Sequence, residues 1–93
     1  MGYIFEWDHS KAKANFRKHG ISFEEASTVF GDVRSVTVHD PEYFDKEDRF
    51  VDIGFSAKLR LLIVVYTERG DRIRIISARK PTTKEQKMYE EKY

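Results

Sequence analysis

Residues 60–81, RLLIVVYTERGDRIRIISARKP, contain two apolar runs separated by a short turn, and this stretch decides the fold. The first run is LLIVVY (61–66), the turn is ERGD (68–71), and the second run begins with the alternating RIRI (72–75). β-Branched runs on either side of a short turn that contains glycine predict a β-hairpin. The first run is apolar on both faces, so we expect it to lie in the centre of a sheet.

The second strand of this hairpin carries three arginines, Arg72, Arg74 and Arg79, and one carboxylate, Glu68, lies in the turn before them. Guanidinium groups form planar forks that match phosphate and stay charged at any working pH. The strand therefore favours a phosphate-bearing partner such as RNA. A structural interpretation stays open, in which Glu68 pairs with Arg69 or Arg72 and the arginines protect the strand from edge pairing.

The composition predicts one small domain that spans residues 1–93. Of the 93 residues, 40% are hydrophobic and 35% are charged, which suffices for one core and leaves no room for a second. The absence of cysteine excludes disulfides and thiolate metal sites and favours the cytoplasm. The longest apolar run is six residues, and the N-terminus does not have the pattern of a signal peptide, so we expect no membrane association.

The net charge of +1 conceals an uneven distribution of charge along the chain. Residues 1–48 hold six Lys/Arg against ten Asp/Glu, whereas residues 49–93 hold eleven against six. The basic half contains the arginine-bearing hairpin. An acidic segment, Asp40 to Asp48, precedes this half and is interpreted as a solvated loop or as a contact site for a basic partner.

The patterns along the whole chain predict an α+β fold. We expect an N-terminal edge strand, two helices, a four-stranded antiparallel meander and a C-terminal helix. Their expected ranges are 3–7 for the edge strand, 9–19 and 23–30 for the helices, 33–38, 49–57, 61–67 and 72–79 for the meander, and 83–91 for the last helix.

Residues with special roles at helix ends mark these boundaries. Asp8 is expected to be an N-cap, and Gly20 is expected to follow the first helix as its C′ residue. Two capping boxes, Ser22 with Glu25 and Thr82 with Glu85, are expected to open the other helices.

Apolar spacing predicts which faces are buried. Ala12, Phe16 and His19 share one face of the first helix. Val51, Ile53 and Phe55 share one face of their strand, and we expect that face to lie under the helices. Met88 and Tyr89 are expected to fold back onto the sheet.

The chain lacks the motifs of nucleotide-binding loops and zinc sites, and its histidines are far apart in sequence, so we expect no metal and no other cofactor. Metal-free phosphodiester chemistry remains, in which the 2′-OH of RNA attacks the adjacent phosphate. Such a reaction needs a base, cations that hold the phosphorane and an acid for the leaving 5′-oxygen.

Candidate groups for these roles follow from residue type. Glu68 or His19 could be the base, and Arg49, Arg74 and Arg79 could supply the positive charge. Tyr66 could donate a proton or stack on a base. The alternative for Lys18 and His19 is that they only end a helix, where cations favour the dipole.

Several separated motifs occur in a fixed order along nearly the whole chain. They are FEWD (5–8), KA with Asn15 (11–15), KHGISFEEA (18–26), Arg49 with Gly54, IRIISAR (73–79), and Glu85 with Tyr89. In this order they resemble the BrnT toxin family of bacterial type II toxin–antitoxin systems.

The resemblance implies a RelE-like ribonuclease fold and a toxin that cleaves mRNA, free or on the ribosome, and thereby slows translation and growth. It also implies neutralisation by BrnA, a small antitoxin with a ribbon-helix-helix part, through which alone operator DNA would be bound. We expect the catalytic groups among His19, Arg49, Glu68, Arg74 and Arg79, with Lys18, Tyr66 and Arg72 as substrate-binding residues. The competing class is a non-catalytic module whose Arg-rich sheet face docks an acidic protein or operator DNA.

Overall fold

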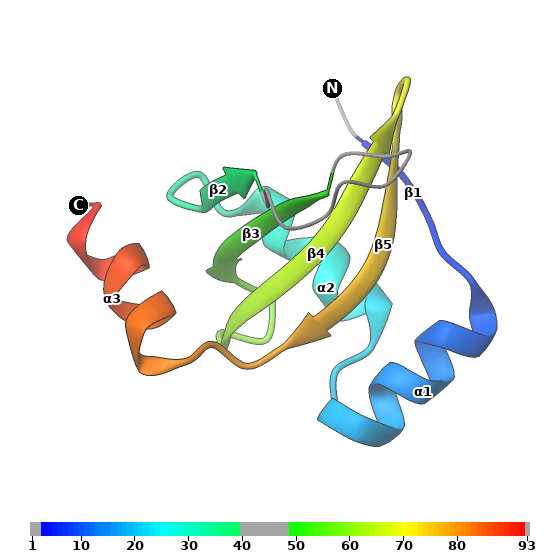
Figure 1. Cartoon of the computed structure of the whole chain (residues 1–93), viewed down its shortest axis with the longest axis horizontal. Coiled ribbons are helices and arrows are strands. Elements are labelled where there is room, and N and C mark those ends of the chain that lie inside the picture. The colour runs from blue at the N-terminus through cyan, green and yellow to red at the C-terminus, as the bar shows by residue number, and fades with distance from the viewer. Residues whose placement is uncertain (1–2, 40–48, 93) are drawn as a thin grey trace.

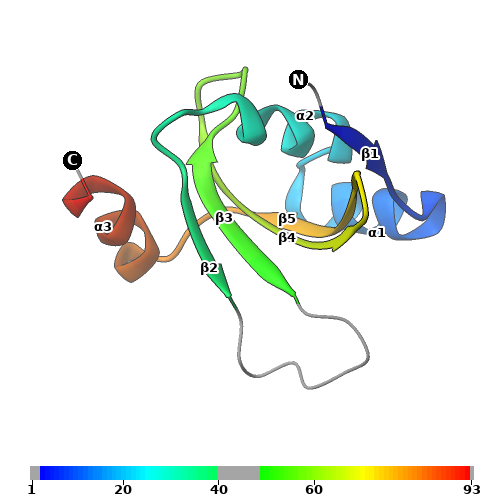
Figure 2. The same ribbon diagram turned by 90° about the horizontal axis from the view of Figure 1, so that it is seen from above.

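The computed structural model describes residues 3–39 and 49–92, so the acidic segment Asp40 to Asp48 lies outside the described residues. The elements are β1 (Ile4–Glu6), α1 (His9–His19), α2 (Phe23–Ser27), a 3₁₀ turn (Thr28–Gly31), β2 (Val36–His39), β3 (Phe50–Phe55), β4 (Leu61–Arg69), β5 (Arg72–Arg79) and α3 (Thr83–Glu91). The described strands form one sheet in the order β1-β5-β4-β3-β2. Helices α1 and α2 lie on one side of it and α3 lies beyond β2 and β3 (Figures 1 and 2).

The α+β class is confirmed, but the sheet is mixed and has five strands. Strands β2 to β5 pair antiparallel in chain order. Strand β1 then joins the other edge parallel to β5, with Ile4 opposite Arg72 and Glu6 opposite Arg74. The predicted edge strand and meander are present, but the prediction did not include the parallel pairing of β1 with β5 that makes the sheet mixed. A strand of only three residues carries too little pattern to indicate that it pairs with a strand almost seventy positions away.

The predicted ends of α1 are confirmed. The Asp8 carboxylate accepts a hydrogen bond from the backbone N–H of Lys11 at 3.0 Å. Gly20 has φ of 71°, and its N–H donates to the Phe16 carbonyl at 2.8 Å. This left-handed conformation is accessible to glycine because it has no Cβ.

The capping box is complete at α3, where Thr82 and Glu85 bond each other's backbone. At α2 only half of the predicted box forms, because Ser22 accepts the N–H of Glu25 while the Glu25 carboxylate points elsewhere. That carboxylate is buried and binds the Arg60 guanidinium through contacts of 2.8 and 2.6 Å. The same guanidinium donates to the Gly20 carbonyl at 3.1 Å. Arg60 therefore fixes the corner between α1 and α2 to the sheet.

The predicted apolar face of α1 is wrong in one respect, because the buried residue of this helix is Asn15. The Asn15 amide donates to the carbonyls of Ile21 and Ala78 at 3.0 and 2.9 Å, and its oxygen accepts the N–H of Ala78 at 3.1 Å. A polar group with all these partners can be buried at little cost. Phe16, expected in the core, is 57% exposed.

The prediction that Val51, Ile53 and Phe55 of β3 face the helices is also wrong. Asp52 lies opposite Val64 and Gly54 lies opposite Leu62, and both partners belong to the core under α2, so this face of β3 meets the helices. Ile53 is buried on the other face, and the ring of Phe55 packs against Tyr89 of α3.

Two features explain this reversal of β3. A Cβ on Gly54 would meet Val29 Cγ1 at 3.0 Å, so glycine allows the 3₁₀ turn to approach the strand closely. The Asp52 carboxylate is satisfied by the hydroxyls of Thr37 and Tyr66 at 2.8 and 2.9 Å. Alternation of apolar residues therefore did not reveal which face the helices cover.

Strand β2 begins at Val36 and not at Val33, because Asp32 organises a turn between the two. Its carboxylate accepts the N–H groups of Arg34 and Phe55 at 2.9 and 2.8 Å and the Tyr89 hydroxyl at 2.7 Å. The last contact confirms that Tyr89 folds back towards the sheet. Three segments distant in sequence therefore meet at one carboxylate.

Candidate functional site

A register shift in the sheet brings the three arginines of β5 to one face. Tyr66 pairs with Ile75, but the preceding residue of β4, Val65, pairs with Ser77, so Ile76 is an extra residue on β5. An extra residue reverses the alternation of side chains beyond it. Without this bulge, the side chain of Arg79 would point towards the core with Ile75. With it, Arg72, Arg74 and Arg79 all lie on the face opposite to α1 and α2, which we call the arginine face.

A carboxylate that the sequence did not single out lies beside two of these arginines. Glu6 of β1 is opposite Arg74 in the parallel register, so both side chains share the arginine face. Its two oxygens are 3.5 Å from Arg72 Nη1 and 3.4 Å from Arg74 Nη1. Glu6 was visible in the sequence only as part of the FEWD motif, and no local spacing connected it to the arginines.

Two further residues lie near Arg74. Thr67 of β4 is directly opposite Arg74 and is 2% exposed, and among residues 3–39 and 49–92 its hydroxyl has no hydrogen-bond partner. Such an unsatisfied buried group is uncommon in a folded protein. Arg49 comes directly before β3, whose first residue, Phe50, pairs with Tyr66. Arg49 therefore lies at the same end of the sheet as Arg74 and Thr67.

Arg79 lies at the other end of β5 and is held by the C-terminal helix. Its guanidinium makes two hydrogen bonds of 2.8 Å to the Glu85 carboxylate. Hydrogen bonding to Arg79 lowers the pKa of Glu85 to about 2. Arg79 is five positions along the strand from Arg74, which corresponds to roughly 17 Å. The structure does not bring these two arginines together.

Glu68 and Tyr66 lie away from the arginine face. Glu68 is opposite Ile73, a core residue, so its side chain is on the helix-bearing face at the exposed end of the hairpin. Tyr66 is 4% exposed and donates its hydroxyl proton to Asp52. Burial raises the pKa of Tyr66, and the neighbouring Asp52 charge adds to this effect.

His19 and Lys18 lie at the C-terminal end of α1, whereas Arg74 lies near its beginning. The positive charge of Arg74 contributes to a lowered pKa of Asp8, the N-cap of α1, although hydrogen bonding to the Lys11 backbone is the larger cause. A helix of 11 residues is about 16 Å long. The structure therefore separates His19 and Lys18 from the cluster around Arg74.

A buried carboxylate also lies under the helix-bearing face. Asp52 is 3% exposed, and burial raises its pKa despite the hydroxyls of Thr37 and Tyr66 that bond to it. The rings of Phe30 and Phe50 pack on Tyr66 beside it. No sequence pattern indicated this group, because aspartate in a strand usually marks a solvent-facing position.

Comparisons with known proteins identify the family and agree with the fold. The family model described as "Ribonuclease toxin, BrnT, of type II toxin-antitoxin system" matches residues 7–85. The chain therefore belongs to the BrnT family of ribonuclease toxins, and a toxin of such a system implies an antitoxin partner and an RNA substrate. No curated protein sequence matches the chain.

A solved structure supports the fold independently. The crystal structure of the ribonuclease toxin BrnT from Brucella abortus superposes with a TM-score of 0.61 at 24% sequence identity. The alignment covers 89% of this chain and 99% of that one. At this identity the likeness concerns the fold. In the part of the chain that the structure describes, no helix is long and apolar enough to span a membrane.

Proposed function

We propose that this chain is a metal-independent endoribonuclease that cleaves RNA through attack of the 2′-OH on the neighbouring phosphate. The observation that carries the proposal is the position of Glu6 between Arg72 and Arg74 on the arginine face. The carboxylate can accept a proton. The two permanent cations beside it can stabilise the negative charge that develops on the phosphorane.

The arginines have donors to spare for a phosphate. Each meets Glu6 through one nitrogen, at 3.5 Å for Arg72 and 3.4 Å for Arg74, and a guanidinium carries five N–H donors. Their side chains are 54% and 32% exposed. We propose that Arg72, Arg74 and Arg49 bind the scissile phosphate and that Glu6 accepts the proton of the 2′-OH. The bond from phosphorus to the 5′-oxygen then breaks, and the leaving 5′-oxygen takes its proton from water.

The other catalytic and RNA-binding residues that the sequence predicted remain second choices, after Glu6 and the arginines around it. Glu68 and His19 are alternative bases, although each lies apart from the arginine pair. Lys18 could bind RNA beyond the scissile bond. Tyr66 could contact RNA only after the buried core around Asp52 becomes exposed. Arg79 could bind phosphate only after its ion pair with Glu85 breaks.

The proposed cellular role is inhibition of translation through cleavage of mRNA in the cytoplasm. We propose a BrnA-like ribbon-helix-helix antitoxin as the neutralising partner, with operator DNA bound through that antitoxin. Membership of the BrnT family supports both proposals. The position of α1 and α2 on one face of a largely antiparallel sheet supports the RelE-like relationship that the resemblance implies.

Cleavage of RNA by the purified, partner-free protein in excess EDTA tests the proposal. We expect cleavage products that end in a 2′,3′-cyclic phosphate, and we expect Glu6→Gln to reduce the rate by about 10²- to 10⁴-fold, the usual contribution of a general base. Glu91→Gln, at the C-terminal end of α3 and far from β1, removes the same charge and is the matched control.

Two outcomes would contradict the proposal in different ways. Cleavage that appears only after Mg²⁺ is added would show that the reaction needs a metal. A folded protein that cleaves no RNA in either buffer would instead favour the binding module, whose arginine face docks an acidic protein or operator DNA.

A further inference from the structure

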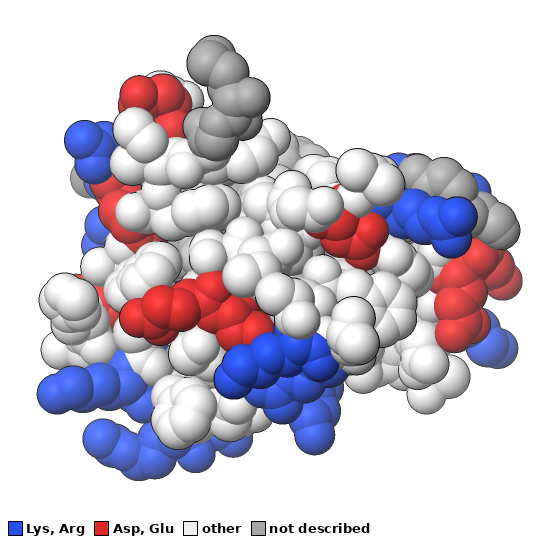
Figure 3. All heavy atoms as spheres, turned by 180° about the vertical axis from the view of Figure 1, so that it is seen from behind, with Lys and Arg blue, Asp and Glu red and all other residues white. Residues whose placement is uncertain are grey.

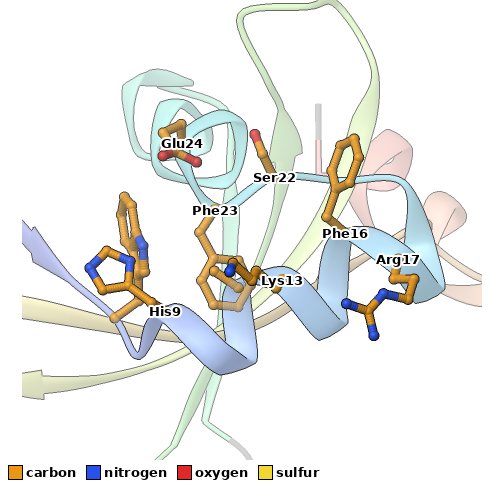
Figure 4. A pocket seen from close by; sticks show the side chains of 9 residues that line it. His9, Lys13, Phe16, Arg17, Ser22, Phe23 and Glu24 are labelled. Carbon is orange, nitrogen blue, oxygen red and sulfur yellow. The ribbon is translucent and has the colours of Figure 1, made fainter.

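A groove that the proposed reaction does not use lies between α1 and α2. It has a volume of about 720 Å³, with Trp7 and Phe23 at its floor and Phe16 on one wall. Figure 4 shows His9 at one end of the groove and Phe16 with Arg17 at the other. The groove is on the helix-bearing side of the sheet, whereas Arg72 and Arg74 project from the opposite side.

The floor of this groove is apolar and rigid. Phe23 is fully buried, and the Trp7 ring contacts it edge-on with centroids 5.9 Å apart. The Arg60–Glu25 pair holds the corner between the helices at 2.6 Å, so the two walls keep their spacing. A preformed apolar cleft of this kind binds without a large ordering cost.

Phe16 contributes an exposed aromatic ring to one wall. The residue is 57% exposed because Asn15 takes the buried position on α1. A large apolar side chain beside an apolar floor forms a continuous patch, and such patches mark interaction sites. Aromatic residues in this setting contribute much of the binding energy of interfaces.

The wall formed by α1 is cationic. His9, Lys13 and Arg17 are spaced four residues apart, which places them in one stripe along the helix, and Lys13 and Arg17 are exposed. Figure 3 shows Lys and Arg side chains gathered over α1, at the lower left of that view. Glu24 on α2 provides the only carboxylate among the residues that line the groove.

We propose that this groove binds an acidic, amphipathic helical segment of the antitoxin. The inference rests on the proposed function for the existence of that partner. Apolar residues of the segment would cover Phe16 and the floor, and its carboxylates would face Lys13 and Arg17. An RNA strand fits less well, because the floor offers apolar edges and one exposed ring and not a row of stacking platforms.

Placement of the groove gives it a distinct role from the arginine face. A segment bound between α1 and α2 leaves Arg72 and Arg74 uncovered, so it anchors the antitoxin. Neutralisation then needs a separate contact of the antitoxin at the arginine face. Mutations in the groove should therefore weaken the affinity for the antitoxin without changing the arginine face itself.

The test compares the affinity for the antitoxin encoded in the same operon between two groove variants and a control. The groove variants are Phe16→Ala and the double variant Lys13→Glu/Arg17→Glu, and the control is Lys84→Glu/Lys87→Glu on α3. We expect the groove variants to bind the antitoxin at least about 30-fold more weakly in calorimetry, the size of an interface hot spot. The control should bind like the wild type, and all variants should cleave RNA alone at the wild-type rate.

The outcomes distinguish this inference from the proposed function. Wild-type antitoxin affinity in both folded groove variants would overturn the inference, and so would loss of RNA binding with the antitoxin affinity intact. Weakened antitoxin binding, in a protein that cleaves no RNA in any form, would support the groove and contradict the ribonuclease mechanism. The two charged side chains are exposed, so the double variant is expected to fold even if Phe16→Ala does not.

Discussion

Arg79, at the end of β5, and Glu85, in the first turn of α3, form two parallel hydrogen bonds of 2.8 Å between guanidinium and carboxylate. Glu85 Oε1 also accepts the N–H of Thr82 at 2.8 Å, so one carboxylate both caps α3 and ties it to the sheet. An arginine expected from sequence to hold phosphate therefore has a structural partner.

Replacing Glu85 with Gln should remove the ion pair and keep a cap, since Gln serves at this position of a capping box. The pKa of Glu85 falls from 4.5 to about 2 on folding, so the pair adds stability that is fully present above pH 4.5. This stability is lost as the pH falls from 4.5 towards 2. We expect Glu85→Gln to cost about 1 kcal/mol at pH 7, because the pair is partly exposed.

Urea denaturation at several pH values measures this difference. The free energies of unfolding of wild type and Glu85→Gln should converge near pH 2. Glu91→Gln, at the end of the same helix, is the control and should follow the wild type. A constant difference across the whole pH range would show that the carboxylate contributes only through the cap.

Asp52→Asn should change the dependence of stability on pH in the opposite sense. Burial raises the pKa of Asp52 in the folded protein, so the wild type binds a proton more tightly when folded. Its contribution to stability is then greatest below the unfolded pKa and is lost as the pH rises through the folded pKa. Asn keeps an oxygen that can accept from Thr37 and Tyr66 but does not titrate.

We therefore expect Asp52→Asn to gain stability relative to the wild type as the pH rises from 3 to 8. Thermal unfolding in matched buffers across this range would show the trend. Parallel curves for the two proteins would mean that the Asp52 carboxylate keeps its unfolded pKa in the folded state.

Thr67→Val should stabilise the fold by about 1 kcal/mol. Valine has nearly the same shape, and the substitution removes a buried hydroxyl whose Oγ1 has no partner in the described part of the structure. Guanidinium denaturation measures the change. A loss of stability would reveal a hydrogen bond at this position, and a loss of RNA cleavage in the stable variant would add Thr67 to the site.

Arg74→Gln and Arg79→Gln should have different effects, although the two residues share a face. Arg74→Gln should lower RNA cleavage by about 10²- to 10³-fold, the cost of removing a group that stabilises developing charge, with little change in melting temperature. Arg79→Gln should lower the melting temperature and affect cleavage less, because Arg79 binds Glu85. Wild-type cleavage by a folded Arg74→Gln protein would move the site away from β1 and β5.

Local interactions explain what could be predicted from sequence. The hairpin of β4 and β5, the N-caps Asp8 and Thr82 and the Gly20 helix end depend on contacts between residues a few positions apart. Such contacts require particular residue types at fixed spacings, so they can be recognised in the sequence. The likeness to the BrnT family was also readable, because its motifs occur along the chain in order.

The sequence alone therefore determined the order of the elements and most of their ends, the family and the presence of arginines on β5. The exceptions are the second helix, which ends at Ser27 and continues as a 3₁₀ turn, and β2, which begins at Val36. Tertiary structure decided which side chains meet. The bulge at Ile76 moved Arg79 to the arginine face, and the parallel pairing of β1 brought Glu6 to Arg74 across 68 positions of sequence. A single extra residue reverses every side chain beyond it, and a strand's partner depends on the packing of the whole sheet. No short window of sequence contains either kind of information.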